Sequence, residues 1–346
     1  MHPSAADPQV RTQVRAASDV DVACDLLVDG LWVDISDDLV KAGQVGYQVD
    51  RTLHRTGQVT LSRELNWGSD RIRVRYQVGS VEVAVGTFIV STPVEAAEET
   101  PRSWTVDVYD LLWLLDDLYG STFVAEQGQG FLATVRGLVE PVGLPLLLAD
   151  EAGGERTISD DRVFPLDEEL TRLQIVNRLL RTVGYRDLWV DGQGRARSEP
   201  IVGLANRGSE WLYDATSEVT EVGAATRERD TFGRVNRLVA LSDDPDADLE
   251  PVTLVVDDGL PTRTELVRLE AADQAALQVQ AEAAFEKSRQ VEDVVEVQVS
   301  PNPLHSHRDV VRLVHPDLDV DAKHLVRSWT LPLDGSDMTL ELERIV

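Results

Sequence analysis

The sequence predicts a β-rich α+β protein in which two small β-barrel domains flank a mixed α/β domain. Short segments rich in Val, Ile, Thr and aromatic residues fill both ends of the chain, which is typical of antiparallel sheets. Apolar residues at helical spacing gather in the middle. At 346 residues the chain is long enough for about two or three domains. We expect an arm at 1–20, a first barrel at 21–103, the α/β domain at 104–216 and a second barrel at 217–346.

Residues 1–20 are small and polar without periodicity, which predicts a flexible arm. The first barrel follows, with strands expected at 24–28, 32–35, 44–49, 58–65, 71–78, 81–90 and 103–108. Asp29-Gly30 predicts a tight hairpin between the first two strands. Strict alternation from residue 71 buries one strand face and turns Arg71, Arg73 and Arg75 toward solvent or an acidic neighbour.

The middle domain begins with apolar residues at helical spacing from Val108 to Leu118. Two further helices resemble each other, because the apolar spacing of TVRGLVEPVG returns in IVNRLLRTVG. Each pattern ends in a glycine, Gly143 or Gly184, which predicts a helix stop. A short apolar strand follows each stop.

The third domain returns to strands, expected at 217–224, 234–241, 251–256, 294–299, 309–314, 323–333 and 338–345. An Ala- and Glu-rich stretch at about 270–290 predicts one long helix laid across this barrel. The acidic stretch 242–250 predicts a solvated loop.

Composition excludes several classes of function. Lys and Arg total 33 against 61 Asp and Glu, a net charge of −28, so the chain repels phosphate and disfavours nucleic-acid binding by charge. The single cysteine, Cys24, forms neither an internal disulfide nor a cysteine-based metal site. We see no secretory signal and no apolar run of the roughly 20 residues that a membrane span needs, so we expect a soluble protein without a membrane anchor.

Two loop motifs are weak matches to ligand sites. Gly128–Ala133 fits a relaxed GxGxxA dinucleotide pattern, but its neighbours look antiparallel, which favours a helix-entry turn. Asp244, Asp246 and Asp248 resemble the opening of a calcium loop. Leu249 and Val255 occupy the positions where that loop needs Gly and Glu, so a solvated loop is favoured.

The densest candidate for metal binding or catalysis is His305-Ser306-His307-Arg308-Asp309. Alternating histidines on an extended chain could share a metal, but a histidine-containing turn before a strand is favoured. His315 and His324 could join only if the fold brings them near. Ser306, His307 and Asp309 are too close in sequence to form a hydrolytic triad.

Adjacent acids are expected by chance in so acidic a chain, and they are interpreted as exposed faces. The pairs are Asp116-Asp117, Asp160-Asp161 and Glu168-Glu169. We therefore name no catalytic, cofactor-binding or metal residue, expect no cofactor, and predict that the chain is not an enzyme.

Three stretches resemble a known family. They are VGTFIVSTP at 85–93, the second VG-ended helix running into LWVDG at 188–192, and DTFGRVNRLVA at 230–240 followed by the long helix and HRDVVRL at 307–313. Their order and spacing resemble the tail-hub or baseplate-hub proteins of tailed bacteriophages and contractile injection systems. The resemblance covers residues 20–346.

The resemblance implies a structural virion protein that forms a homotrimer. Each subunit would supply two similar barrels, so the ring adapts a sixfold tail tube to a threefold spike or fibre and forms part of the DNA ejection channel. The implied partners are the tail tube or distal tail protein, the central spike or fibre protein and the tape measure protein. DNA would be met only in transit. Such a protein is assembled in the host bacterial cytoplasm and resides in the virion tail.

Three other functions stay open at this stage. A peptidoglycan- or polysaccharide-degrading tail enzyme would need a carboxylate pair across a cleft or a zinc site, and neither is legible. An adhesion module would need exposed aromatic platforms, whereas the tryptophans lie in apolar patterns: Trp32, Trp67, Trp104, Trp113, Trp189, Trp211 and Trp329. A distal tail ring would form a sixfold ring instead of a threefold one.

Overall fold

The computed structural model describes residues 20–345, apart from 80, 97–101, 150–155, 202–206, 218–221, 231–234, 243–248, 258, 260, 270–273 and 289–291. The chain divides into two units: Met1–Thr226 with Glu296–Val346, and Arg227–Val295. Strands predominate and helices are few, which confirms the β-rich α+β class. No helix in the described ranges is long and apolar enough to cross a membrane.

The main sheet contains 13 strands drawn from both ends of the chain. Its strands are β1 Val20–Val28, β2 Leu31–Asp34, β3 Leu39–Gln48, β4 Arg55–Leu61, β5 Arg71–Val78, β6 Val81–Ala96, β7 Ser103–Asp110, β13 Trp211–Asp214, β14 Val222–Asp230, β18 Glu292–Val299, β19 Val310–His315, β20 Val320–Pro332 and β21 Met338–Arg344. Every strand predicted for the first barrel is present.

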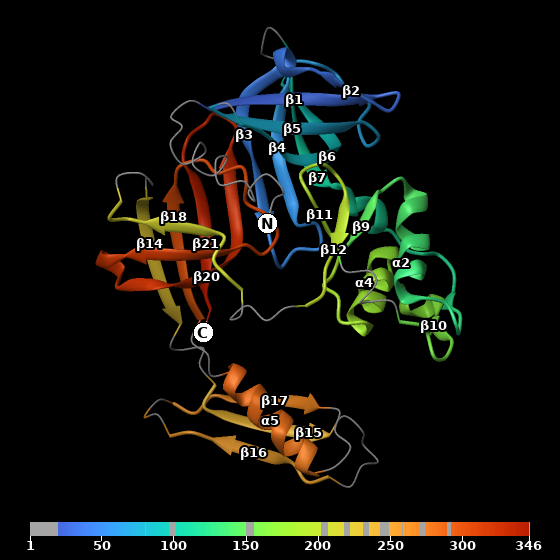
Figure 1. The fold of residues 1–346 in the computed structure, drawn as a ribbon, viewed down its shortest axis with the longest axis vertical. Helices are drawn as coiled ribbons and strands as arrows, with labels where there is room; N and C mark the ends of the chain where they lie inside the picture. Colours follow the sequence, from blue (N-terminus) through green and yellow to red (C-terminus); the bar gives the residue numbers. More distant parts are fainter. Residues whose placement is uncertain are drawn as a thin grey trace. The chain divides into compact units, whose positions relative to one another are not determined.

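The strand order joins the two ends of the sequence. It runs β14-β18-β21-β20-β3-β4-β7-β6-β5-β1-β2, with β19 beside β20 and β13 beside β19. The junction is the antiparallel pair β20–β3, in which Ser328 faces Gln48 and Pro332 faces Gln44 (Figure 1). Among the described strands the pairings form an open path, so the two-barrel arrangement stays a prediction.

Strand β5 shows why the alternating pattern works. Ile72 and Val74 are fully buried. On the opposite face, Arg75 pairs with Asp25 at 2.8 Å. The Arg73 guanidinium lies 3.9 Å from the centre of the Trp32 ring. This basic face therefore has partners within its own chain.

The middle of the chain packs around its own apolar cluster. Its elements are the 3-10 helix η3 Leu111–Leu115, β8 Phe123–Ala125, α2 Phe131–Val139, η4 Glu140–Val142, β9 Leu146–Leu148, β10 Arg162–Phe164, η5 Leu166–Glu168, α4 Arg172–Thr182, β11 Trp189–Val190 and β12 Ala196–Ser198. Gly143 and Gly184, both at φ 78°, confirm the predicted stops.

The prediction of a helix from Val108 to Leu118 is wrong. Residues 108–110 complete strand β7, and only the short helix η3 follows. The apolar spacing misled because Val108 is buried in the sheet between β4 and β6, where Gly57 and Val90 are its register partners. Asp110 then begins η3 by accepting a hydrogen bond from the Leu112 amide at 3.0 Å.

The unit Arg227–Val295 has a separate small core. Strands β15 Arg237–Ser242, β16 Val252–Val255 and β17 Thr264–Leu269 form a three-stranded sheet. Helix α5 Gln274–Ser288 packs Leu277, Ala281 and Phe285 against it. Strand β17 was not expected, because its Glu, Leu and Arg residues favour helix.

Two short 3-10 helices complete the described elements. They are η2 Ser36–Asp38, between β2 and β3, and η7 Pro316–Leu318, between β19 and β20.

Candidate functional site: a buried histidine network and an open groove

The segment 305–309 forms a buried turn between β18 and β19, as the sequence favoured. The His305 ring joins the Tyr213 hydroxyl at 2.7 Å through Nε2 and the Asp309 carboxylate at 3.2 Å through Nδ1. Asp309 Oδ2 also accepts hydrogen bonds from Trp211 Nε1 at 3.2 Å and the Ser306 amide at 3.0 Å. Burial would raise the pKa of Asp309, but the hydrogen bonds from His305 and Ser306 lower it overall.

His307 belongs to a different cluster. Its Nδ1 lies 3.0 Å from the Tyr47 hydroxyl. Its ring stacks on Trp189 with centroids 5.2 Å apart and meets the His54 ring edge-on at 4.8 Å. Three segments far apart in sequence, the hairpin of Tyr47 and His54, the strand of Trp189 and the turn of His307, thus meet at one imidazole.

Burial controls the protonation of this cluster. It lowers the pKa of His54 to about 4, with a further lowering by the charge of Arg55. It also lowers the pKa of His307 well below its usual range, with contributions from His54 and Arg308. Both rings are therefore neutral at pH 7.

The alternating histidines do not share a metal, because His305 and His307 enter two separate clusters. His324 is buried on β20 and donates from Nδ1 to the Ala322 carbonyl at 3.0 Å, while His315 ends β19. Over the described ranges no group of three His, Cys, Asp or Glu side chains could hold a metal ion. A triad is also ruled out here, since Asp309 contacts His305 instead of His307.

One buried polar contact, between Arg55 and Asp110, was not predicted from the sequence. The Arg55 amide donates to Asp110 Oδ2 at 2.9 Å, and the Arg55 guanidinium donates to the Val190 carbonyl at 3.0 Å. Burial raises the pKa of Asp110 to about 6. The sequence offered one signal for this contact. Asp110 stands directly before the apolar residues of η3, and Asp is a favoured helix cap.

The other sequence motifs have structural roles. Gly128, at φ 85°, donates its amide to the Ile158 carbonyl at 2.9 Å in the turn that enters α2. The neighbouring strands β8 and β10 are antiparallel, as the helix-entry interpretation required. Asp161 accepts a hydrogen bond from the Gln127 amide at 2.7 Å. Asp244, Asp246 and Asp248 lie outside the described residues.

The tryptophans, all of which the structure describes, are mostly covered. Trp189, Trp211 and Trp329 are buried, and Trp113 is the single exposed one, at 48%. Trp32, Trp67 and Trp104 are half-buried, so three of the seven tryptophans are core residues, fewer than expected from the apolar patterns.

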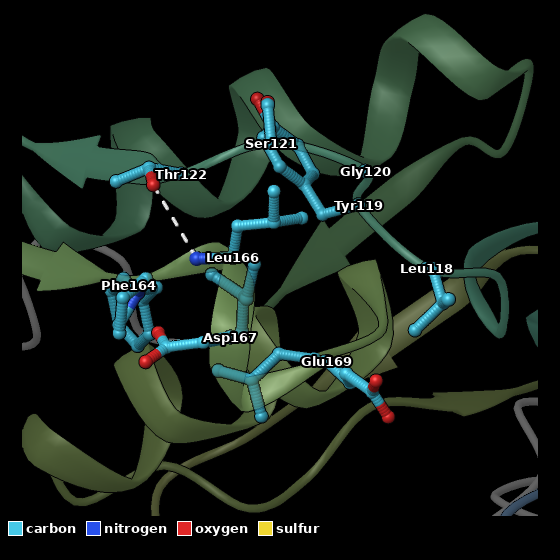
Figure 2. A pocket seen from close by; sticks show the side chains of 12 residues that line it. Leu118, Tyr119, Gly120, Ser121, Thr122, Phe164, Leu166, Asp167 and Glu169 are labelled. Atoms are coloured by element: carbon cyan, nitrogen blue, oxygen red, sulfur yellow. Dashed lines mark hydrogen bonds between the residues drawn. The ribbon is translucent and has the colours of Figure 1, made fainter.

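An open groove lies between the loop 118–122 and the segment 164–170 (Figure 2). It encloses about 550 Å³ and is lined largely by apolar side chains. Leu118 and Leu166 line it although each is 57% exposed. Leu166 is held at the wall by its amide, which donates to the Thr122 hydroxyl at 3.4 Å. Asp167 and Glu169 stand at its edge.

No protein-family model matches the sequence, and no curated protein matches it. Solved structures do match the fold. A tail protein from Neisseria meningitidis aligns over 94% of this chain and 97% of its own, with a TM-score of 0.65 and 16% identity. The 43 kDa tail protein of prophage MuSo2 from Shewanella oneidensis aligns over 94% and 98%, with a TM-score of 0.62 and 12% identity.

The chain has the fold of phage tail proteins. A third match extends this fold beyond phages. The Escherichia coli protein c3393 aligns over 95% of this chain and 74% of its own, with a TM-score of 0.50 and 10% identity. It is described as a type VI secretion component structurally similar to the T4 tail proteins gp27 and gp5. None of the three is described as an enzyme.

The buried network has a clear role within this tail-protein fold. Tyr47 on β3, Trp189 on β11 and His307 before β19 come from the beginning, middle and end of the chain. Their contacts tie these three parts together. The network therefore joins parts of the fold, whereas the groove is open at the surface.

Proposed function

We propose that the chain is a structural subunit of a phage tail, or of a related injection device, and that it acts there as the tail or baseplate hub. The observation that carries the proposal is the fold match along almost the whole length of both this chain and the Neisseria tail protein. The likeness of the E. coli protein to gp27 and gp5 supports the hub over other tail positions.

The proposed hub is a homotrimer. The barrels at 21–103 and 217–346, the second interrupted by the unit Arg227–Val295, would give a ring of three subunits six similar domains, which adapts a sixfold tube to a threefold spike or fibre. The pairing of β20 with β3 supports this arrangement, because it holds strands of both domains in one sheet. Residues 104–216 would lie between them in sequence as the mixed α/β domain.

The proposed partners follow from this position. The tail tube or distal tail protein would bind the sixfold side, the spike or fibre protein the threefold side, and the tape measure protein and DNA would pass through the centre. A net charge of −28 supports a non-adhesive channel, since acids facing the lumen repel phosphates. The hub would be assembled in the host cytoplasm and carry no catalytic residue.

Native mass and electron-microscopy class averages test the proposal. A hub predicts a mass about three times 38.2 kDa and a threefold ring with a central hole, alone or on purified tail tube. A sixfold ring would instead indicate a distal tail ring. A chain that stays monomeric both alone and with tail tube would contradict the hub, and turnover of peptidoglycan or polysaccharide by that monomer would favour the enzyme.

A further inference from the structure

The groove between 118–122 and 164–170 has the chemistry of a docking site. Two leucines, Leu118 and Leu166, expose more than half of their surface there. Asp167 and Glu169 are exposed at its edge, and within the described part of the chain neither carboxylate pairs with a basic side chain. An occupant that fits should therefore offer apolar side chains with positive charges beside them.

The chain itself contains a segment of this kind. Residues 8–17, PQVRTQVRAA, hold Val10 and Val14 four positions apart, each followed directly by an arginine, Arg11 or Arg15. This arm segment has no acid, in a protein with a net charge of −28. The other undescribed stretches of five residues or more, 97–101, 150–155, 202–206 and 243–248, are acidic or uncharged. Charge complementarity therefore selects the arm segment.

We propose that the arm segment of one copy docks in the groove of a second copy. The described chain starts at Val20, which pairs with Val78 at one end of β5. The other end of β5 approaches the middle of the chain, since a Cβ at Gly143 would lie 3.7 Å from Arg71 Nη2. Val20 thus lies at the end of β5 away from the part of the chain that carries the groove. The remaining 19 residues reach roughly 60 Å when extended, enough to meet a neighbour.

This docking requires a second copy and no particular symmetry. A ring of any order satisfies it, so a sixfold ring would contradict the threefold hub and leave the docking standing. Conversely, a threefold ring whose arms lie elsewhere would contradict the docking and leave the hub intact.

Cysteine cross-linking between two full-length chains tests the docking. One chain carries Val14→Cys, the other carries Leu166→Cys and a mass tag, and the mixture is oxidised with copper phenanthroline. The native Cys24 does not interfere, because it is buried and burial raises its thiol pKa to about 12. A tagged heterodimer is expected. The matched control is Leu212→Cys, an exposed apolar position on β13.

The expected yield with Leu166→Cys exceeds that with Leu212→Cys by roughly fivefold or more, since docking raises the local concentration of the arm. Charge reversal by Arg11→Glu with Arg15→Glu should reduce the yield to the control level. Equal yields at both positions would overturn the proposal. A chain with both Val14→Cys and Leu166→Cys that closes its disulfide internally, as a monomer, would also overturn it, because the groove would then take its own arm.

Discussion

At the scale of residues, the decisive feature is that polar groups buried near 305–309 have partners from distant strands. Asp309 is fully buried and serves three donors, two of them side chains: His305 and Trp211. Replacing an acceptor that serves three donors should destabilise the fold, because each buried donor left without a partner costs its desolvation free energy.

Asp309→Asn should therefore lower the free energy of unfolding by about 2–4 kcal/mol. The amide oxygen can take the place of Oδ2, where all three donors converge, but the substitution removes the negative charge beside His305 and brings an NH2 group into a fully buried site. Urea unfolding measures the change, and Asp321→Asn is the matched control, since Asp321 pairs with Arg312 at 2.8 Å with both side chains more than half exposed. The control should cost much less, because a solvent-exposed ion pair contributes little to stability. Equal losses would show that Asp309 has no special role.

Acid should weaken the fold through His54 and His307. Their pKa values are lower in the folded chain than the usual 6.5, to about 4 for His54. The unfolded chain then binds more protons between these values, so stability is full above about pH 6.5 and is lost as the pH falls toward 4. Asp110 acts in the opposite direction, because its pKa is raised to about 6. The two histidines should outweigh the one acid.

Urea midpoints at pH 7 and pH 4.5 check this pH dependence. The loss between the two should be smaller in His54→Phe, which keeps a ring beside Tyr47 but cannot bind a proton. His315→Gln, at the end of β19 and outside this cluster, should leave the loss unchanged. A loss of the same size in His54→Phe and the parent would exclude His54 as its source.

At the scale of elements, the two related helices end in the left-handed backbone that their glycines permit. A Cβ at Gly184 would meet nothing within 4 Å, so its φ of 78° alone opposes a side chain. Gly137, inside α2, also has open space around it but no such φ. Substitutions at Gly184 and Gly137 therefore separate the effect of backbone strain from the effect of steric contact.

Gly184→Ala should destabilise the fold by about 1–2 kcal/mol, the cost of a left-handed residue with a side chain. Gly137→Ala should stabilise it by about 0.5–1 kcal/mol, because alanine favours helix. Thermal unfolding of both variants gives the comparison. If both variants shifted the melting temperature in the same direction, the positive φ at Gly184 would not decide the effect of the alanine.

Local pattern predicted much of the fold at this scale. Strand β5, the stop at Gly184 and the turn at 305–309 each depend on residues close together in sequence, and each was found as expected. The contacts of Tyr47 with His307 and of His305 with Tyr213 join residues about 90 to 260 positions apart. Local sequence patterns do not relate residues so far apart. The sequence therefore predicted the histidine turn but not the residues that contact it. The groove was not predicted for the same reason, because two segments separated in sequence form it.

At the scale of the whole molecule, the chain combines two units with separate cores. The unit Arg227–Val295 is the smaller, and small domains bury less of their surface. A buried ion pair joins its two ends, with Arg227 Nε donating to Asp293 Oδ1 at 2.7 Å. Separate cores predict that damage to one unit is not transmitted to the other.

Leu277→Ala tests this independence. Leu277 is fully buried on α5 against the β15 sheet, and its truncation should cost about 2–5 kcal/mol. Hydrogen exchange measured by mass spectrometry should then accelerate in peptides covering 237–288 and stay at the parent rate in β20 and β21. The reciprocal variant, Leu340→Ala at a fully buried position of β21, should accelerate exchange in the main sheet. If Leu277→Ala accelerated exchange along the whole chain, the two units would unfold as one cooperative domain.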